Sequence, residues 1–141
     1  MMKRLFTVLL LVLPLSLSAQ MQFGYLSYKT IMAEMPEFAQ VKQSMSELKA
    51  KYDAEATRGE EEFQKKFADF LQGQKDFPQT IMQKRQAELQ SLMKNGISFR
   101  IESQKTLEQA EKDLMAEVKK KLNNVILEVG VEYGYAFVLN I

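Results

Sequence analysis

The feature that most constrains the fold is a long stretch that contains almost no helix breakers. Between Glu37 and Tyr133 there is one proline, Pro78, and only four glycines. A proline costs roughly 3 kcal/mol in a helix interior and a glycine about 1 kcal/mol, so such a stretch favours helices interrupted mainly at the proline. We predict helices over residues 37–72 and 79–133, separated by a turn at residues 73–78.

Apolar residues recur along both predicted helices at steps of three and four, the spacing of a coiled-coil seam. At 1.5 Å per residue the helices are about 55 and 80 Å long, too long for a compact domain of this size. We therefore predict an antiparallel helical hairpin. Its expected seam residues are Val41, Met45, Leu48, Tyr52, Phe63, Phe67 and Phe70 in the first helix, and Met82, Leu89, Met93, Ile97, Leu107, Leu114, Val118, Leu122, Val125 and Val129 in the second.

Short aromatic-rich segments flank this hairpin and indicate strands over residues 22–28 and 135–139. Gly134 suits a left-handed cap at the end of the second helix. Two strands alone are marginally stable and leave open edges, so three or more copies are expected to complete a small β-body. The predicted fold class is mainly α with a small β part: a coiled-coil tentacle joined to a β-body completed by oligomerisation. The residues expected in that body are Phe23, Tyr25, Leu26, Tyr135, Phe137, Val138 and Leu139.

Residues 1–19 have the organisation of a secretory signal peptide. Lys3 and Arg4 precede an apolar run over residues 5–15, and small residues follow it. We expect cleavage after Ala19, with Ser18 as the alternative; an uncleaved N-terminal anchor is the other interpretation. Residues 20–141 are then a single domain with 17 basic and 18 acidic residues, which is predicted to be exported.

The composition excludes several classes of chemistry. The chain has no His and no Cys, so neither a His/Cys zinc site nor a thiol nucleophile or Ser-His-Asp triad can form. Glu60, Glu61 and Glu62 are consecutive and fan around a helix instead of converging. The balance of 19 basic and 18 acidic residues argues against nucleic-acid binding. We therefore predict no enzyme, no catalytic residues, no cofactor, no metal and no nucleic-acid partner.

The distal half of the predicted hairpin combines Phe, Met and cationic residues. From Arg58 to Arg100 there are eight Lys and Arg residues and six Asp and Glu residues. Phe and Met form adaptable binding surfaces, and the slight positive charge favours partly anionic partners. For Phe67, Phe70 and Met93 packing in the seam is the favoured interpretation, whereas Phe77 at the turn is expected to have little to pack against. The predicted binding residues are Phe63, Phe67, Phe70, Phe77, Met82, Met93, Lys65, Lys66, Lys75, Lys84 and Arg85.

In their order and spacing these segments resemble the Skp/OmpH family of periplasmic chaperones, especially its Bacteroidetes-type members. In that family acidic residues are common near positions 136 and 140, where this chain has Ala136 and Asn140. Members of the family usually have a further strand beyond the position of Ile141. The β-body expected from residues 20–141 is therefore smaller than the one that the resemblance implies. The resemblance is carried by the signal peptide and by residues 23–28, 31–37, 51–53, 62–66, 88–92 and 131–138.

The resemblance implies a periplasmic homotrimer whose three tentacles surround a cavity. It implies an ATP-independent holdase chaperone that binds unfolded outer-membrane proteins after export and prevents their aggregation during outer-membrane assembly. It also implies a contact with lipopolysaccharide or the membrane surface. The alternative from a different class is a non-enzymatic coiled-coil spacer or stalk of the cell envelope, for which a regular Leu/Ile seam and a polar turn are expected.

Overall fold

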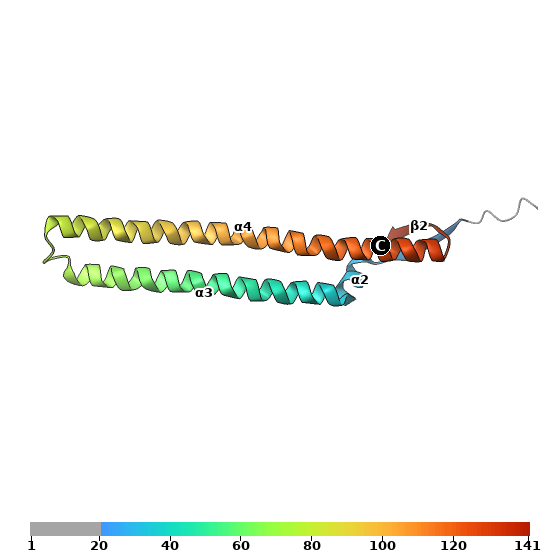
Figure 1. Ribbon diagram of the computed structural model, residues 1–141, viewed down its shortest axis with the longest axis horizontal. Coiled ribbons are helices and arrows are strands. Elements are labelled where there is room, and N and C mark those ends of the chain that lie inside the picture. Colours follow the sequence, from blue (N-terminus) through green and yellow to red (C-terminus); the bar gives the residue numbers. More distant parts are fainter. Residues whose placement is uncertain (1–20) are drawn as a thin grey trace, which may run out of the picture. The chain divides into compact units, whose positions relative to one another are not determined.

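The computed structural model describes residues 21–141, and the signal peptide predicted at residues 1–19 lies outside them. The predicted fold class is confirmed: the chain is mainly helical, with two long packed helices and a small two-stranded sheet (Figure 1). The elements in chain order are β1 (Gln22–Leu26), α2 (Tyr28–Glu34), α3 (Pro36–Gly73), α4 (Gln79–Glu132) and β2 (Tyr135–Asn140).

Contacts group the described residues into two compact units. We call residues 33–119 the hairpin unit, because they hold α3 and most of α4. We call residues 21–32 with 120–141 the strand unit, because they hold both strands. No helix in the described part of the chain is both long and apolar enough to cross a membrane.

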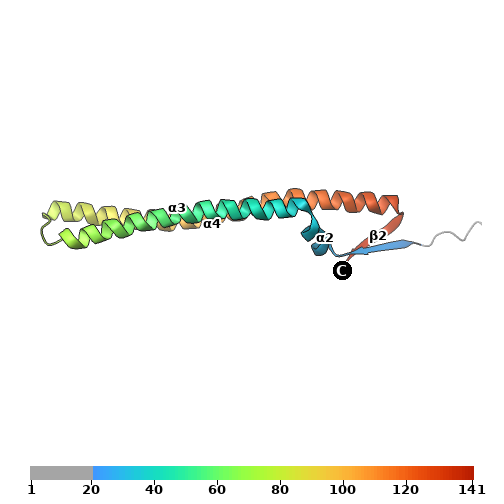
Figure 2. The ribbon, with the colours of Figure 1, turned by 90° about the horizontal axis from the view of Figure 1, so that it is seen from below.

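In the hairpin unit α3 and α4 run antiparallel, side by side (Figures 1 and 2). Helix α3 begins at Pro36, one residue earlier than predicted, because the extended backbone of Met35 (φ −69°, ψ 129°) lets the proline occupy the first helical position. The amides of Phe38 and Ala39 both donate to the carbonyl of Met35, at 3.1 and 3.3 Å. Helix α3 continues one residue beyond the prediction, to Gly73.

The predicted seam is correct along most of α3, where only Phe67 is exposed, at 43%, and is partly wrong along α4. On α3, Val41 is buried and Met45, Leu48 and Tyr52 are half-buried. Five predicted seam residues of α4 are exposed: Met93 (53%), Ile97 (56%), Leu114 (39%), Val125 (45%) and Val129 (41%). At 100° per residue the covered positions 89, 92, 99, 103 and 107 share an arc of about 80°, and Met93 and Ile97 lie outside that arc by about 40° and 80°. The covered positions of α4 follow the 3.6-residue period of the helix and include Leu89, Leu92, Phe99, Ser103, Leu107, Val118 and Leu122.

In the strand unit β1 and β2 form a parallel pair. Phe23 lies opposite Phe137 and Leu26 opposite Asn140, and a register shift separates Gln22 from Phe23. Gly134, with a φ of +66°, takes the predicted left-handed conformation between α4 and β2, where a residue with a Cβ would be strained. Helix α4 ends one residue earlier than expected, and β2 extends one residue further, to Asn140.

Strand β1 is shorter than predicted, since it ends at Leu26 and not at residue 28. Ser27 instead caps α2: its Oγ accepts from the backbone N–H of Thr30 at 3.4 Å. The Oδ1 of Asn140 accepts from the backbone N–H of Tyr28 at 2.8 Å. Two side chains therefore satisfy amides at the start of α2, so the backbone turns into a helix here instead of continuing the strand.

Candidate functional site

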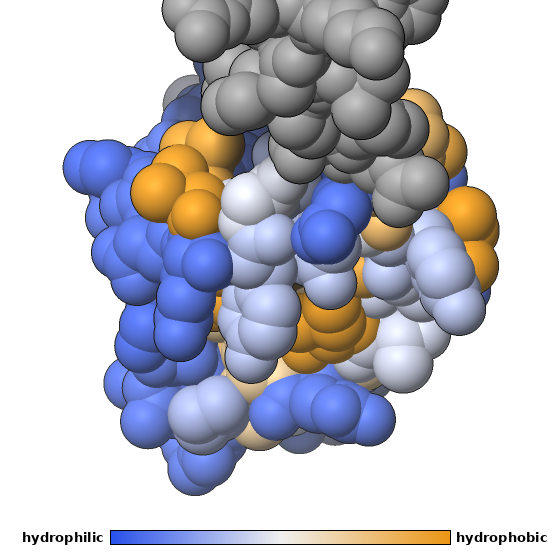
Figure 3. Space-filling model, turned by 90° about the vertical axis from the view of Figure 1, so that its right-hand side faces the viewer, coloured by the Kyte–Doolittle hydropathy of each residue, from blue (hydrophilic) through white to orange (hydrophobic). Residues whose placement is uncertain are grey.

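The strands present an open hydrophobic face. Phe23, Tyr25, Phe137 and Leu139 are between 56% and 77% exposed, and the rings of Phe23 and Phe137 stack at 6.1 Å. In the space-filling view of Figure 3, hydrophobic residues (orange) reach the surface. A parallel pair of strands normally has both faces covered. In the described residues each strand also has only one neighbour, so the sheet is open at both edges.

The other predicted body residues are turned to a covered side. Leu26, Tyr135 and Val138 are half-buried and line a hollow of about 560 Å³ with residues of α4, and the exposed Phe23 and Tyr25 also border this hollow. A Cβ at Gly130 would lie 3.7 Å from Val138, which places β2 close to the end of α4. The structure thus brings the seven predicted body residues together in one unit but divides them between an open and a covered side.

At the distal turn of the hairpin unit the aromatic residues pack against each other. The rings of Phe70 and Phe77 lie 6.3 Å apart. A Cβ at Gly73 would lie only 2.5 Å from the Cζ of Phe77, so the ring fits because this position is glycine. The expectation that Phe77 has little to pack against is therefore wrong. A sequence reading misses this contact because the space comes from an absent side chain.

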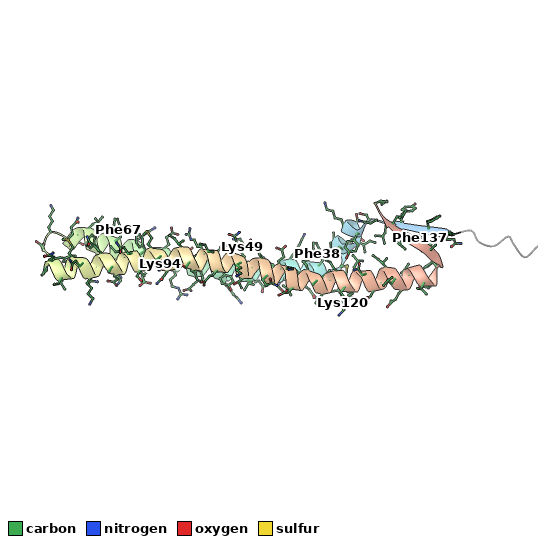
Figure 4. All side chains as sticks on the ribbon, turned by 90° about the horizontal axis from the view of Figure 1, so that it is seen from above. Phe38, Lys49, Phe67, Lys94, Lys120 and Phe137 are labelled. Carbon is green, nitrogen blue, oxygen red and sulfur yellow. The ribbon has the colours of Figure 1, made fainter. Side chains whose placement is uncertain are left out.

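The six predicted apolar binding residues separate into two groups. Phe67 and Met93 are 43% and 53% exposed, whereas Phe63, Phe70, Phe77 and Met82 are half-buried. The ring of Phe67, labelled in Figure 4, stacks on that of Phe63 with nearly parallel planes, 5.9 Å apart, so the exposed ring contacts the covered one.

The five predicted cations are also not equivalent. Lys66 on α3 and Arg85 on α4 both pair with Glu88, the arginine at 3.2 Å. The hydrogen bond from Lys66, assisted by Arg85, lowers the pKa of the Glu88 carboxyl. Lys65, Lys75 and Lys84 are exposed and form no ion pair with any described residue. Of the five predicted cations, only these three therefore carry charge that is not already paired within the hairpin unit.

Sequence reasoning named Met93 as a binding residue but missed the rest of an exposed apolar stripe on α4. Met93, Ile97 and Ile101 follow one another at four-residue steps and are 53%, 56% and 65% exposed. Near the turn, Leu71 and Ile81 are also 48% and 41% exposed. The signal was present in the spacing, because at 100° per residue positions 93, 97 and 101 lie progressively further from the arc that positions 92, 99 and 103 share.

These surfaces offer apolar contact and scattered positive charge. Among residues 21–141, no group of three or more acidic side chains is placed to hold a metal ion. The family model described as outer membrane protein (OmpH-like) matches residues 22–141 and so includes every helix and strand. No curated protein matches the chain.

Proposed function

The chain belongs to the OmpH-like family, also called the Skp family, and from this membership we propose that it is an ATP-independent holdase chaperone of the periplasm. Family membership suggests a periplasmic chaperone role, and the family is one of non-enzymatic chaperones. In the proposed role the chain binds unfolded outer-membrane proteins after export and prevents their aggregation during outer-membrane assembly.

The observation that carries this proposal is the exposed apolar surface of the hairpin unit. Phe67, Leu71, Met93, Ile97 and Ile101 are all more than 40% exposed on helices that have another, covered face. Burying apolar surface yields about 25 cal/mol per Å², so several such side chains can hold a client weakly over a wide area. A spacer gains nothing from exposing them, which disfavours the envelope-stalk alternative.

The predicted binding residues take different parts in this proposal. Phe67 and Met93 contact the client, and the exposed Lys65, Lys75 and Lys84 attract its acidic segments. Phe70 and Phe77 pack together at the turn, Phe63 stacks with Phe67, Met82 is half-buried on α4, and Lys66 and Arg85 pair with Glu88. The free lysines are also the proposed contact with lipopolysaccharide or the membrane surface.

We further propose that three copies complete the β-body. The open face of Phe23, Tyr25, Phe137 and Leu139 and the unpaired edges of both strands support this. Such a face is costly to leave in water, and another copy presents the same apolar residues. The signal peptide proposed at residues 1–19 accounts for delivery to the periplasm.

The test dilutes a urea-unfolded outer-membrane β-barrel protein into buffer with the purified chain and follows light scattering without ATP. We expect aggregation to be suppressed at a near-stoichiometric amount of trimer. A chain that is helical and trimeric but leaves the scattering unchanged would contradict the holdase proposal and favour the spacer.

A further inference from the structure

Methionine sulfur is the group of this protein that peroxides oxidise most readily, because the chain has no Cys. Among the described methionines, Met21, before β1, is 66% exposed and Met93, on α4, is 53% exposed. The others are half-buried; they are Met32, Met35, Met45, Met82 and Met115. Oxidation requires access to the sulfur, so Met93 is the methionine of the hairpin unit that is most open to attack.

The segment of α4 that holds this methionine is open to water on every side. All of residues 93–98 are exposed, over about one and a half helical turns. Gly96 falls within the covered arc of α4, yet a Cβ added there would meet nothing within 4 Å. Across the hairpin, Arg100 pairs with Glu60, and at the preceding Gly59 an added Cβ would also meet nothing within 4 Å. The seam between the helices is therefore thin at this level.

Met93 is also part of the exposed apolar stripe with Ile97 and Ile101. Oxidation to the sulfoxide converts a flexible apolar side chain into a polar one. Because Met93 lies outside the covered arc, water can solvate the added oxygen and no helix packing has to change. Oxidation at this position should therefore change the surface of the stripe without unfolding the hairpin.

We propose that Met93 is a peroxide-sensitive modification site whose oxidation weakens the binding of unfolded clients to the stripe, which rests on the proposed chaperone function and adds a regulation to it. The sulfur attacks one oxygen of hydrogen peroxide, so that an S–O bond forms as the O–O bond breaks. The hydroxide that leaves takes the proton from the new S–OH group and becomes water. Sulfur loses an electron pair and the peroxide gains it. Reduction of the sulfoxide restores the apolar side chain.

The first test incubates the purified chain with hydrogen peroxide and follows the sulfoxide at each methionine by peptide mass spectrometry. We expect Met93 to be oxidised about 3-fold or more faster than Met82 and Met115, which are half-buried on the same helix. Circular dichroism should show unchanged helical content. Equal rates at the three methionines, or a loss of helical content as Met93 is oxidised, would overturn the proposal.

The second test measures the Kd of a fluorescently labelled, urea-unfolded outer-membrane β-barrel protein after dilution, before and after peroxide treatment. About half of the Met93 side chain is available for burial, so we expect oxidation to weaken binding about 3- to 12-fold. Met93→Leu keeps an apolar side chain without sulfur and should retain its affinity after treatment. Met21→Leu removes the exposed methionine of the strand unit and should remain sensitive. Equal sensitivity of these two variants would contradict the assignment to Met93.

The outcomes separate this proposal from the chaperone proposal. If the untreated chain binds no client, the chaperone proposal fails, and the dye anilinonaphthalene sulfonate, which binds exposed apolar surface, decides about Met93. Dye fluorescence should fall on peroxide treatment of the unchanged chain but not of Met93→Leu. Equal falls in both proteins would overturn the Met93 proposal, and a chain that still binds client would keep the chaperone proposal.

Discussion

The contact between Gly73 and Phe77 predicts that Gly73→Ala destabilises the chain, whereas helix propensities alone predict that it stabilises the chain. Replacing a glycine by alanine within a helix ordinarily stabilises it by up to about 1 kcal/mol. This should be the result at Gly59 and Gly96, where an added Cβ would meet nothing within 4 Å. At Gly73 the same Cβ would lie 2.5 and 2.6 Å from the Cζ and Cε1 atoms of Phe77.

The ring of Phe77 must then move by about 1 Å, away from its packing position against Phe70, because Cβ contacts below 3.0 Å do not occur. Overpacking of this kind costs about 1–3 kcal/mol. After the helix gain is subtracted, we expect Gly73→Ala to lower the free energy of unfolding by about 0.5–2 kcal/mol. Gly59→Ala and Gly96→Ala should raise it.

The assay is urea unfolding followed by circular dichroism at one fixed protein concentration, because oligomer stability depends on concentration. A double-mutant cycle isolates the contact. In a Phe77→Ala background the obstruction is gone, so Gly73→Ala should become neutral or stabilising. If Gly73→Ala stabilises the chain as much as Gly59→Ala does, the packing of Phe77 against Gly73 is refuted.

Three further predictions concern other parts of the molecule. The pKa of Glu88 is lowered in the folded state, so its contribution to stability is present above about pH 4.5 and is lost as the pH falls through the folded-state pKa. The urea midpoint should therefore fall less between pH 6 and pH 3 in Glu88→Gln than in the unchanged chain. An equal fall in both proteins would contradict this. Leu122→Ala should cost about 2–5 kcal/mol because Leu122 is 2% exposed, whereas Leu127→Ala, at a position 66% exposed, should stay within about 0.5 kcal/mol in the same urea assay. Phe23→Asp and Phe137→Asp should each reduce the mass measured by sedimentation to that of one copy while helical content remains; an unchanged mass would show that the open sheet face does not join copies.

Much of the local structure could be predicted from the sequence because its causes are local. Pro36 and Pro78 delimit the long helices, and Gly134 supplies the left-handed residue between α4 and β2. The scarcity of other breakers determines the helix lengths to within one or two residues. These signals act through the conformational preferences of single residues, which need no knowledge of distant neighbours.

The exposure of the predicted site residues was harder to predict from the sequence, because it depends on which face of each helix points toward its partner helix. Ser103, and not Ile97, takes a covered position on α4, because the 3.6-residue period must be kept over many turns. An error of one residue in that phase changes which side chains reach a partner. The same reasoning explains why the stripe of Met93, Ile97 and Ile101 was partly assigned to the seam.

The sequence by itself therefore determined the elements, their order and the family, since these follow from residue types along the chain. The tertiary structure alone decided which residues meet: Phe77 against Gly73, Lys66 and Arg85 at Glu88, and Asn140 at the start of α2. Such contacts join positions from 3 to 112 residues apart. They depend on packing, on missing side chains and on backbone groups that need a partner, and none of these is a property of a single residue.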